Sequence, residues 1–415
     1  MREHVPFRES LRATRRCPRV PRPLAGVVVL DLTRLLPGPF CTQLLANLGA
    51  DVVKVEDPEV GDYMRSVPPA VGDTSYPFLM VNRGKRSVVI DLRTREGRQV
   101  LYRLARKADV FVEQFRPSTV KRLGIDYPRL RRANPRIVYC SFGGFGRTGP
   151  YADKPAHDLN FQALAGVLSV TATRGDGRPT IPGVPVGDLA SALLAAFSIV
   201  ASLHRRERFG GGEFLEVPIF DATVSLMVLN LARYLGTGEV PMPGETIVTG
   251  VFPFYSLYET KDGRWISVGC VEPKFWRRLC EILGMPEFAD TQFVTGEAGK
   301  PVVDAMAASF RTKTLAEWTA VLEPEDLPVM PVLRVDEVVA DPHLAARRLL
   351  PEVGAGKKRT KVLAHPVKAR ASNIATPSGA PSRGEHTDDV LRWAGFTRRQ
   401  IADLRRDGIV GPTVP

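Results

Sequence analysis

Short apolar runs alternate with helical segments through the first third of this sequence. Val27–Leu32 is a continuous run rich in β-branched residues, and Asp51–Glu56 is a second predicted strand. Arg95–Lys107 instead places Val100, Leu101 and Leu104 at helical spacing. Further strands are predicted at Ser87–Leu92, Asp109–Phe115 and Arg136–Phe142, and a further helix at Cys41–Leu48. Strands that alternate with helices indicate βαβ units, so we expect an α/β fold with a Rossmann-like open domain and a mostly parallel sheet.

The rest of the chain predicts a second, smaller domain. A long apolar helix at Leu189–His204 precedes a strand at Phe214–Phe220 and a helix at Thr223–Leu235. The Pro/Gly-rich stretch Gly236–Gly244 then indicates a boundary. Beyond it we expect a hairpin (Phe254–Thr260 and Trp265–Cys270), helices at Glu272–Leu283, Thr314–Leu322 and Val335–Ala340, a connector at Pro351–Gly384, and helices at Thr387–Ala394 and Thr397–Asp407. The expected division is a large domain over 23–238, a small α+β domain over 239–350, and a linker with C-terminal helices over 351–415.

Composition narrows the class of protein. The net charge is +12, but residues 1–22 hold seven arginines against two glutamates, and the remaining excess is spread along the chain. This pattern does not favour a nucleic-acid partner, and residues 1–22 are predicted to be a disordered basic extension. No uninterrupted apolar run reaches the roughly 18 residues needed to span a membrane, so we predict no membrane partner. Five scattered cysteines and six unclustered histidines predict a reduced, cytoplasmic protein without a metal.

A glycine-rich motif is present but lacks the context of a dinucleotide site. Gly144–Gly149 reads G-x-G-x-x-G and follows a predicted strand. A dinucleotide-binding loop needs a helix directly after its last glycine, whereas Pro150–Pro155 reads as loop. We therefore interpret the motif as a turn.

Two residues that could act chemically each have an ordinary structural interpretation as well. His157 precedes a predicted helix at Leu159–Leu168, and a histidine there can be structural or catalytic. Asp188 opens the long apolar helix. It can be a helix cap, or a carboxylate placed where backbone N–H groups are offered to an anion. The pattern alone leaves both pairs of alternatives open.

Separated motifs in this order resemble those of the class III CoA-transferases (CaiB/BaiF type), a family that also contains α-methylacyl-CoA racemase. The resemblance runs from about Leu24 to Gly411. The matching segments are 35–39 (LLPGP), 48–56 (LGADVVKVE), 82–87 (NRGKRS), 108–113 (ADVFVE), 116–118 (RPS), 134–136 (NPR), 187–188 (GD), 263–265 (GRW), 272–275 (EPKF) and 384–387 (GEHT).

The resemblance implies an interlocked ring homodimer whose large domain is built from both chain ends. It also implies a CoA thioester as substrate, with no permanently bound cofactor. By resemblance, the nucleotide of CoA is contacted by Ile90, Asp91, Leu92, Arg93, Gln114, Phe115, Arg116 and Arg122. The pantetheine and thioester are contacted by Ala156, Asp158, Leu159, Asn160 and Phe161 around His157.

One position departs from the family pattern. The family usually has Arg after the acidic residue of the second motif, whereas this chain has Asp57 after Glu56. This removes one phosphate or adenine contact. Lys54, Arg83 and Arg86 are the candidates to replace it.

The resemblance implies thioester chemistry at Asp188 in either of two forms. In a transferase its carboxylate attacks the thioester, and an aspartyl-CoA intermediate follows. In a racemase it is one of two proton carriers, which needs a second base on the opposite face of an enolate. His157 stands where racemase-like members have this second base, and Glu272 where they have the residue that orients it. We therefore favour a racemase of 2-methylacyl-CoA thioesters, with a CoA-transferase as the alternative.

Overall fold

The computed structural model describes residues 21–411 except 73, 173–176, 355–358, 370–373 and 375–378. The expectation for residues 1–22 falls almost wholly outside the described residues. The chain divides into two compact units. Unit 1 contains residues 1–154, 188–218 and 348–415, and unit 2 contains residues 155–187 and 219–347. Unit 1 is thus built from three stretches of chain, which include both ends.

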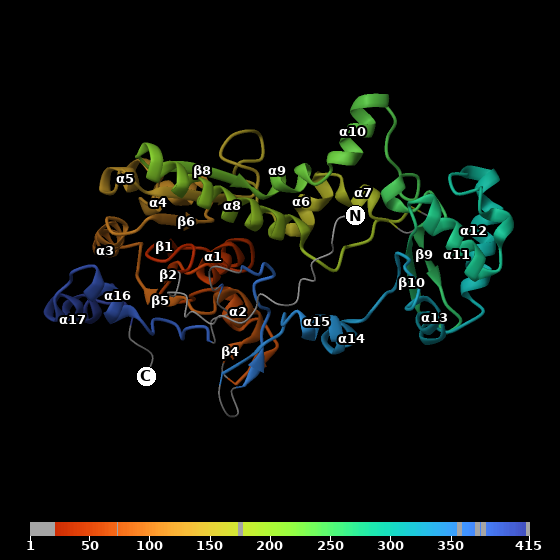
Figure 1. Ribbon diagram of the computed structural model, residues 1–415. Coiled ribbons are helices and arrows are strands. Elements are labelled where there is room, and N and C mark those ends of the chain that lie inside the picture. The colour runs from red at the N-terminus through yellow and green to blue at the C-terminus, as the bar shows by residue number, and fades with distance from the viewer. Residues whose placement is uncertain are drawn as a thin grey trace, which may run out of the picture. The chain divides into compact units, whose positions relative to one another are not determined.

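A six-stranded parallel sheet forms the centre of unit 1 (Figure 1). Its strands are β1 (Val28–Asp31), β2 (Asp51–Glu56), β5 (Arg86–Val89), β6 (Val110–Glu113), β7 (Val138–Gly143) and β8 (Glu213–Pro218). Their spatial order is β5-β2-β1-β6-β7-β8, and every pairing is parallel. The chain thus winds outward from β1 in one direction and then continues from β6 in the other. In such sheets ligands bind beyond the carboxyl ends of the strands at this reversal, here β1 and β6.

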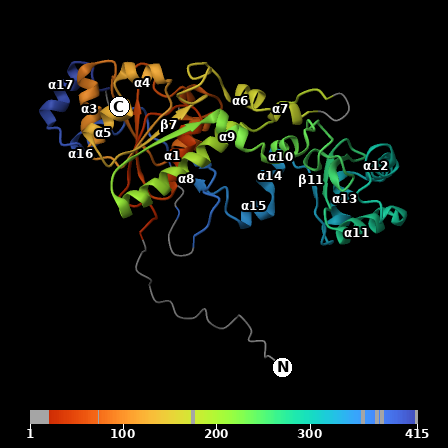
Figure 2. The same cartoon turned by 90° about the horizontal axis from the view of Figure 1, so that it is seen from above.

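Helices cover both faces of the sheet. On one face, α3 (Arg95–Ala105), α5 (Tyr127–Ala133), α16 (Thr387–Trp393) and α17 (Arg398–Arg406) pack on residues such as Leu30 and Phe111. On the other face, α1 (Pro37–Asn47) and α8 (Val186–Phe209) pack on Val29 and Val112. Both views show the C-terminal helices α16 and α17 beside α3 (Figure 1 and Figure 2). The C-terminal segment is therefore an integral part of the core of unit 1.

Shorter elements complete unit 1. They are the helices α2 (Tyr76–Asn82) and α4 (Pro117–Leu123), the 3-10 turn η1 (Tyr63–Ser66), and two small hairpins formed by β3 (Ala70–Val71) with β4 (Thr74–Ser75) and by β12 (Glu352–Val353) with β13 (Thr360–Lys361). The β12–β13 hairpin lies within the predicted connector. The Gly144–Gly149 segment forms bends after β7, and no helix follows it before residue 158.

Helix α8 is long and apolar enough to cross a membrane by length and composition alone, as is the bent helix pair Ile219–Ser225 and Val228–Thr237. The most apolar 18-residue stretch of α8 has a mean hydropathy of 1.9, and 44% of this stretch is buried. Within unit 1, Ala192, Ala195 and Ile199 of α8 are fully buried in the core beneath the sheet. Packing against that core accounts for the apolar character of this face of the helix.

Unit 2 has a core of its own. The strands β9 (Tyr255–Glu259), β10 (Trp265–Gly269) and β11 (Val329–Pro331) form an antiparallel sheet in the order β11-β10-β9. Tyr258, Ile266 and Val268 on its inner face pack against α11 (Pro273–Leu283), α12 (Gly296–Phe310) and α13 (Leu315–Leu322). The remaining elements are α6 (Asp158–Leu164), α7 (Val167–Val170), α9 (Ile219–Ser225), α10 (Val228–Thr237), α14 (Val335–Ala340), α15 (Pro342–Ala346), η2 (Ile247–Thr249) and η3 (Pro286–Phe288).

The observed division differs from the expected one in two stretches of the chain. Residues 155–187 and 219–238, expected in the large domain, cluster with unit 2. The predicted helix at Leu159–Leu168 is two helices, because Gly166 adopts a left-handed conformation with φ of 84° between α6 and α7. The predicted helix at Thr223–Leu235 is likewise divided into α9 and α10, which meet at a bend of 66°.

Candidate active site

The predicted nucleotide contacts lie where the strands of unit 1 end. Asp91, Leu92 and Arg93 follow β5, and Gln114–Arg116 follow β6. Arg122 lies in the last turn of α4. Arg116 and Arg122 are exposed, whereas Ile90 is 1% exposed and packs into the core. Only the backbone of Ile90 can therefore meet a ligand at this edge.

The turn after β5 is braced by its own charges. The Asp91 carboxylate accepts the backbone N–H of Arg93 at 2.9 Å and also pairs with its guanidinium. These hydrogen bonds from Arg93 lower the pKa of Asp91. A second ion pair joins Arg93 to Glu59. Arg93 remains about half exposed, so an anionic ligand would compete with Glu59 for it.

The turn after β6 contacts an arginine that the sequence analysis did not single out. Gln114 donates to the carbonyl oxygen of Arg34 at 2.8 Å. The guanidinium of Arg34 lies 5.2 Å from the ring centre of Tyr63 and 5.7 Å from that of Phe115. Arg34 follows β1 by three residues, which puts a cation at the reversal between β1 and β6. Its position in the loop beyond a predicted strand was the only available signal.

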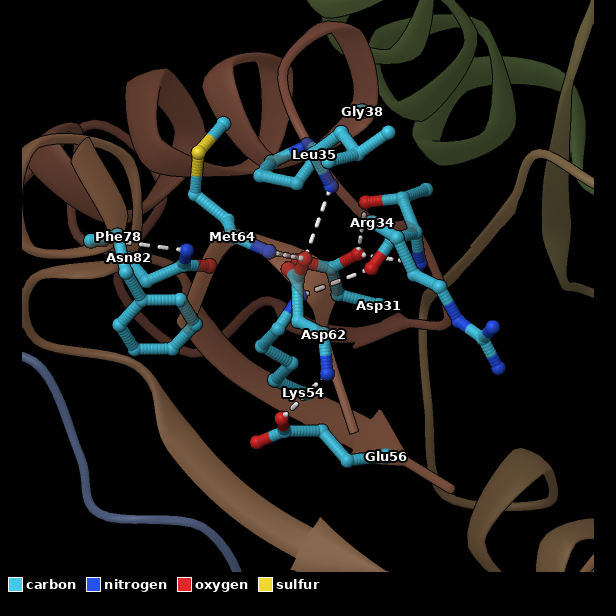
Figure 3. A network of polar contacts seen from close by, with 12 residues as sticks. Asp31, Arg34, Leu35, Gly38, Lys54, Glu56, Asp62, Met64, Phe78 and Asn82 are labelled. Carbon is cyan, nitrogen blue, oxygen red and sulfur yellow. Dashed lines mark hydrogen bonds and ion pairs between the residues drawn. The ribbon is translucent and has the colours of Figure 1, made fainter. Parts of the chain in front are cut away.

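Below Arg34, buried charges support the loop that follows β1 (Figure 3). Lys85 pairs with Asp31 at 2.9 Å and Lys54 pairs with Asp62 at 2.8 Å, all four side chains being fully buried. Asp62 accepts the backbone N–H of Leu35 at 3.0 Å. Figure 3 shows Asp31, Lys54 and Asp62 converging while the Arg34 side chain points away from them. The network thus holds the loop from beneath and leaves Arg34 on its outer side.

Two of the buried charges, Asp31 and Lys54, are stabilised by their neighbours. Burial alone would raise the pKa of Asp31, but the ammonium groups of Lys85 and Lys54 outweigh burial and hold it well below its usual value. Burial alone would lower the pKa of Lys54, and the carboxylates of Asp31, Asp62 and Glu56 raise it instead. Both groups therefore stay ionised inside the protein.

The three cations expected to replace the missing family arginine are all engaged elsewhere. Lys54 is fully buried and donates to the carbonyl of Thr33, so its side chain is not accessible for the CoA contact that the resemblance implies. Arg83 is 1% exposed and donates to the carbonyls of Met80 and Leu363. Arg86 pairs with Asp51. Asp57 itself caps a turn by accepting the backbone N–H groups of Glu59 and Val60.

The predicted catalytic segment is tied to the start of α8 by a hydrogen bond within unit 2. One carboxylate oxygen of Asp158 accepts the backbone N–H of Gly187 at 2.9 Å, and the other accepts from Gln162. His157 precedes Asp158 in the chain, and Asp188 follows Gly187. The two candidate catalytic residues are therefore the covalent neighbours of one hydrogen-bonded pair.

His157 and Asp188 each occupy a helix start. His157 is the N-cap residue of α6, and its backbone N–H donates to the Asn160 side chain at 3.0 Å. The His157 side chain is exposed, and that of Asp188 is half-buried in the first turn of α8. Of the other predicted thioester contacts, Leu159 and Asn160 are exposed, Ala156 is half-buried and Phe161 is 2% exposed. Phe161 thus helps to anchor α6 in its unit.

Gly187 has no room for a side chain. A Cβ atom there would lie 2.5 Å from the Thr223 hydroxyl and 3.2 Å from the Asp158 carboxylate. We expect Gly187→Ala to displace the Asp158 contact and to lower turnover at least tenfold, because small shifts of catalytic groups are costly. The measurement is the catalytic rate together with the thermal unfolding midpoint. Gly183→Ala, whose Cβ would meet nothing within 4 Å, is the matched control and should keep wild-type activity. Wild-type turnover in Gly187→Ala would contradict this account.

Glu272 is the exposed N-cap residue of α11. Within the described part of the single chain, no hydrogen bond joins it to His157. The expected orienting contact is therefore not formed in one chain. Among the described residues, no three His, Cys, Asp or Glu side chains gather as they would around a metal ion. The described cysteines Cys41, Cys140, Cys270 and Cys280 are buried free thiols.

Comparison with known proteins identifies the family. The model of CoA-transferase family III matches residues 24–387. A succinyl-CoA:mesaconate CoA-transferase of Haloarcula hispanica is 38% identical over 388 residues, covering 88% of this chain and 95% of that protein. Human α-methylacyl-CoA racemase is 33% identical over 391 residues, covering 93% of this chain and 97% of that protein.

The solved structures give the same result. The crystal structure of a CAIB/BAIF family protein from Brucella suis superposes with a TM-score of 0.80 at 29% identity, covering 90% of this chain and all of that one. The α/β fold with its parallel sheet is the fold of that family. The relatives include a racemase and several CoA-transferases, enzymes that act on CoA thioesters. This chain therefore belongs to CoA-transferase family III.

Proposed function

We propose that this chain racemises 2-methylacyl-CoA thioesters by transferring the α-proton through an enolate. The observation that carries the proposal is the Asp158–Gly187 hydrogen bond, which has His157 and Asp188 as its covalent neighbours. Together they supply an imidazole and a carboxylate, the two proton carriers that inversion at one carbon needs. Histidine is the side chain that most often removes or returns protons in enzymes that work near neutral pH.

The remaining chemistry is stabilisation of negative charge on the thioester oxygen. The start of a helix favours an anion because the helix dipole places partial positive charge there. Asp188 lies in the first turn of α8, so an enolate beside it would lie at the positive end of this dipole. In this mechanism one residue removes the proton, the helix start stabilises the enolate, and the other residue returns the proton to the opposite face.

We propose that the carboxyl edge of the sheet in unit 1 binds the nucleotide of CoA. Arg116 and Arg122 are exposed there, and Arg34 stands on the outer side of the loop after β1. Guanidinium groups bind phosphates through paired N–H donors. Arg34 is therefore our candidate for the phosphate-binding role that the carboxylate of Asp57 cannot fill.

The deciding experiment is proton exchange in deuterated water. Incubation with (2R)- and (2S)-2-methylacyl-CoA thioesters, without any added carboxylic acid, should incorporate deuterium at the α-carbon and interconvert the two. Mass spectrometry and chiral chromatography measure the two events separately. No exchange across a series of acyl chain lengths would reject the racemase.

A CoA-transferase is the second candidate, because several relatives carry that name and the nucleophile would again be Asp188. It predicts that an acyl-CoA loses its CoA only when a second carboxylic acid is present. Hydroxylamine added during turnover should then modify Asp188, because it attacks acyl-aspartate intermediates. An unmodified Asp188 in an active enzyme would count against this candidate.

We further propose a cytoplasmic homodimer. Unit 1 exposes Leu193, Leu194 and Phe197 along α8, and unit 2 exposes Val228 and Leu235 on α10. Contiguous exposed apolar side chains on regular elements are typical of protein interfaces. Light scattering coupled to gel filtration should give twice the chain mass of 45.6 kDa.

A further inference from the structure

Glu113 is a buried carboxylate that has no role in the proposed proton transfer. It is the last residue of β6 and is 0% exposed. Alternate residues of a strand face the same side of the sheet, so Glu113 faces the same side as Phe111. Phe111 packs in the core that α3 and α5 cover. Asp31 lies on the opposite face, against Thr42 of α1, so Glu113 is separate from the charge network below Arg34.

The contacts of Glu113 join the turns beyond β6 and β7. Its Oε2 accepts the backbone N–H of Phe115 at 2.7 Å. Its Oε1 lies 3.3 Å from the Tyr139 hydroxyl, which also donates to the carbonyl of Ile125 at 2.9 Å. The Ser141 hydroxyl lowers the pKa of Glu113, and the Arg147 guanidinium lies 3.4 Å from that hydroxyl.

We propose that Glu113 is a positioning residue for CoA, whose carboxylate holds the Gln114–Arg116 turn in its binding conformation and releases part of that hold when protonated. This role of Glu113 rests on the proposed function, in which the turn contacts the nucleotide of CoA. Phe115 is the middle residue of the turn, so the hydrogen bond from its N–H to Glu113 restrains the backbone of both Gln114 and Arg116. Gln114 in turn donates to Arg34, so the same hydrogen bond also steadies the cation after β1.

The hydrogen bond between the Glu113 carboxylate and the Phe115 N–H depends on pH, because its strength depends on the charge of Glu113. Burial raises the pKa of Glu113 to about 7, against the opposing effects of the Ser141 hydrogen bond, the Phe115 N–H and the Arg147 charge. The titratable and charged groups that face it are Tyr139 of β7 and Arg147 of the following turn, and Asp126 acts through Tyr139. Hydrogen bonds to an ionised acceptor are roughly twice as strong as neutral ones. The turn is therefore held more firmly above pH 7 than below it.

Ionisation of Glu113 has opposite effects on the two properties: it favours CoA binding but lowers the stability of the fold. The pKa of Glu113 is higher in the folded chain than its ordinary value of 4.5, so ionisation costs folding stability. This cost is fully present above pH 7 and disappears as the pH falls towards 4.5. Glu113→Gln, which is neutral at every pH, should therefore raise the unfolding midpoint above pH 7 and leave it unchanged near pH 4.5.

The test is isothermal titration of the full chain with CoA between pH 5.5 and 8.5. Glu113→Gln keeps an acceptor but no charge, so we expect its dissociation constant to be about fivefold higher than wild type at pH 8 and equal at pH 6. Glu113→Ala leaves the Phe115 N–H without an acceptor, and we expect about a tenfold increase at both pH values. The CoA phosphate itself titrates near pH 6, so wild type and variant are compared at each pH.

Asp341→Asn is the matched control, because Asp341 also accepts backbone N–H groups but lies at the start of α15 in unit 2. It should bind CoA as wild type does. In all folded variants the rate at saturating thioester should stay within twofold, so that the change falls on KM. The inference would be overturned, while the proposed function stands, if Glu113→Gln lost the same CoA affinity at every pH. It would also be overturned if neither Glu113 variant lost any CoA affinity. A wild-type chain that binds no CoA would overturn both.

Discussion

Asp188→Asn is expected to lower the rate of racemisation by a factor of about a thousand or more. The amide cannot exchange a proton as the carboxyl does, and a positioned acid or base contributes about 10²–10⁴-fold to a rate. The replacement is nearly isosteric and keeps the first turn of α8, so the fold should persist. Chiral chromatography of the 2-methylacyl-CoA products measures the rate. Glu207→Gln, on the same helix but exposed near its far end, should retain wild-type activity.

The same variant separates the two candidate functions. In a two-base racemase, Asp188→Asn should still exchange the α-proton of the one enantiomer that faces His157, without inverting it. His157→Ala should show the reverse preference. In a transferase, His157→Ala keeps CoA transfer to a carboxylic acid, and no variant exchanges the α-proton. Loss of exchange for both enantiomers in Asp188→Asn, with transfer also lost, would reject the two-base mechanism.

Apolar periodicity was sufficient to predict the sheet of unit 1. β2 was predicted at Asp51–Glu56 and has those bounds, because its β-branched residues Val52, Val53 and Val55 favour a strand. α11 ends at Leu283 as predicted, because Pro273 suits a helix start and Gly284 adopts the left-handed conformation at its end. α12 was missed, since Pro301 within it reads as a helix breaker.

The misassigned and missed site residues depend on tertiary contacts. Lys54 and Glu113 both lie in predicted strands, and no sequence pattern shows that their charges are buried beside Asp62 or the Phe115 N–H. Arg34 becomes a candidate only because the sheet order brings the ends of β1 and β6 together. The resemblance led to the prediction of His157 and Asp188, whereas the Asp158–Gly187 hydrogen bond beside them depends on the fold.

Lys85→Met is expected to lower the free energy of unfolding by about 3 kcal/mol, the largest stability effect of a single substitution proposed for this chain. Lys85 is fully buried, and its ammonium lies within 3.0 Å of Asp31, Pro39, Thr42 and Asn82 oxygens. Methionine nearly matches its volume but leaves the Asp31 carboxylate without its nearest cation. An uncompensated buried charge costs more than the pair contributes. Urea unfolding followed by fluorescence and circular dichroism measures the change.

The attribution to charge, rather than to packing, requires two further variants. Asp31→Val combined with Lys85→Met removes both charges, and a buried ion pair replaced by apolar groups often costs little. We therefore expect the double variant to be more stable than Lys85→Met alone, although it carries one more substitution. Lys300→Met removes the same type of side chain from an exposed pair with Glu297 and should leave stability unchanged. A double variant less stable than Lys85→Met would show that shape, not charge balance, governs this site beneath Arg34.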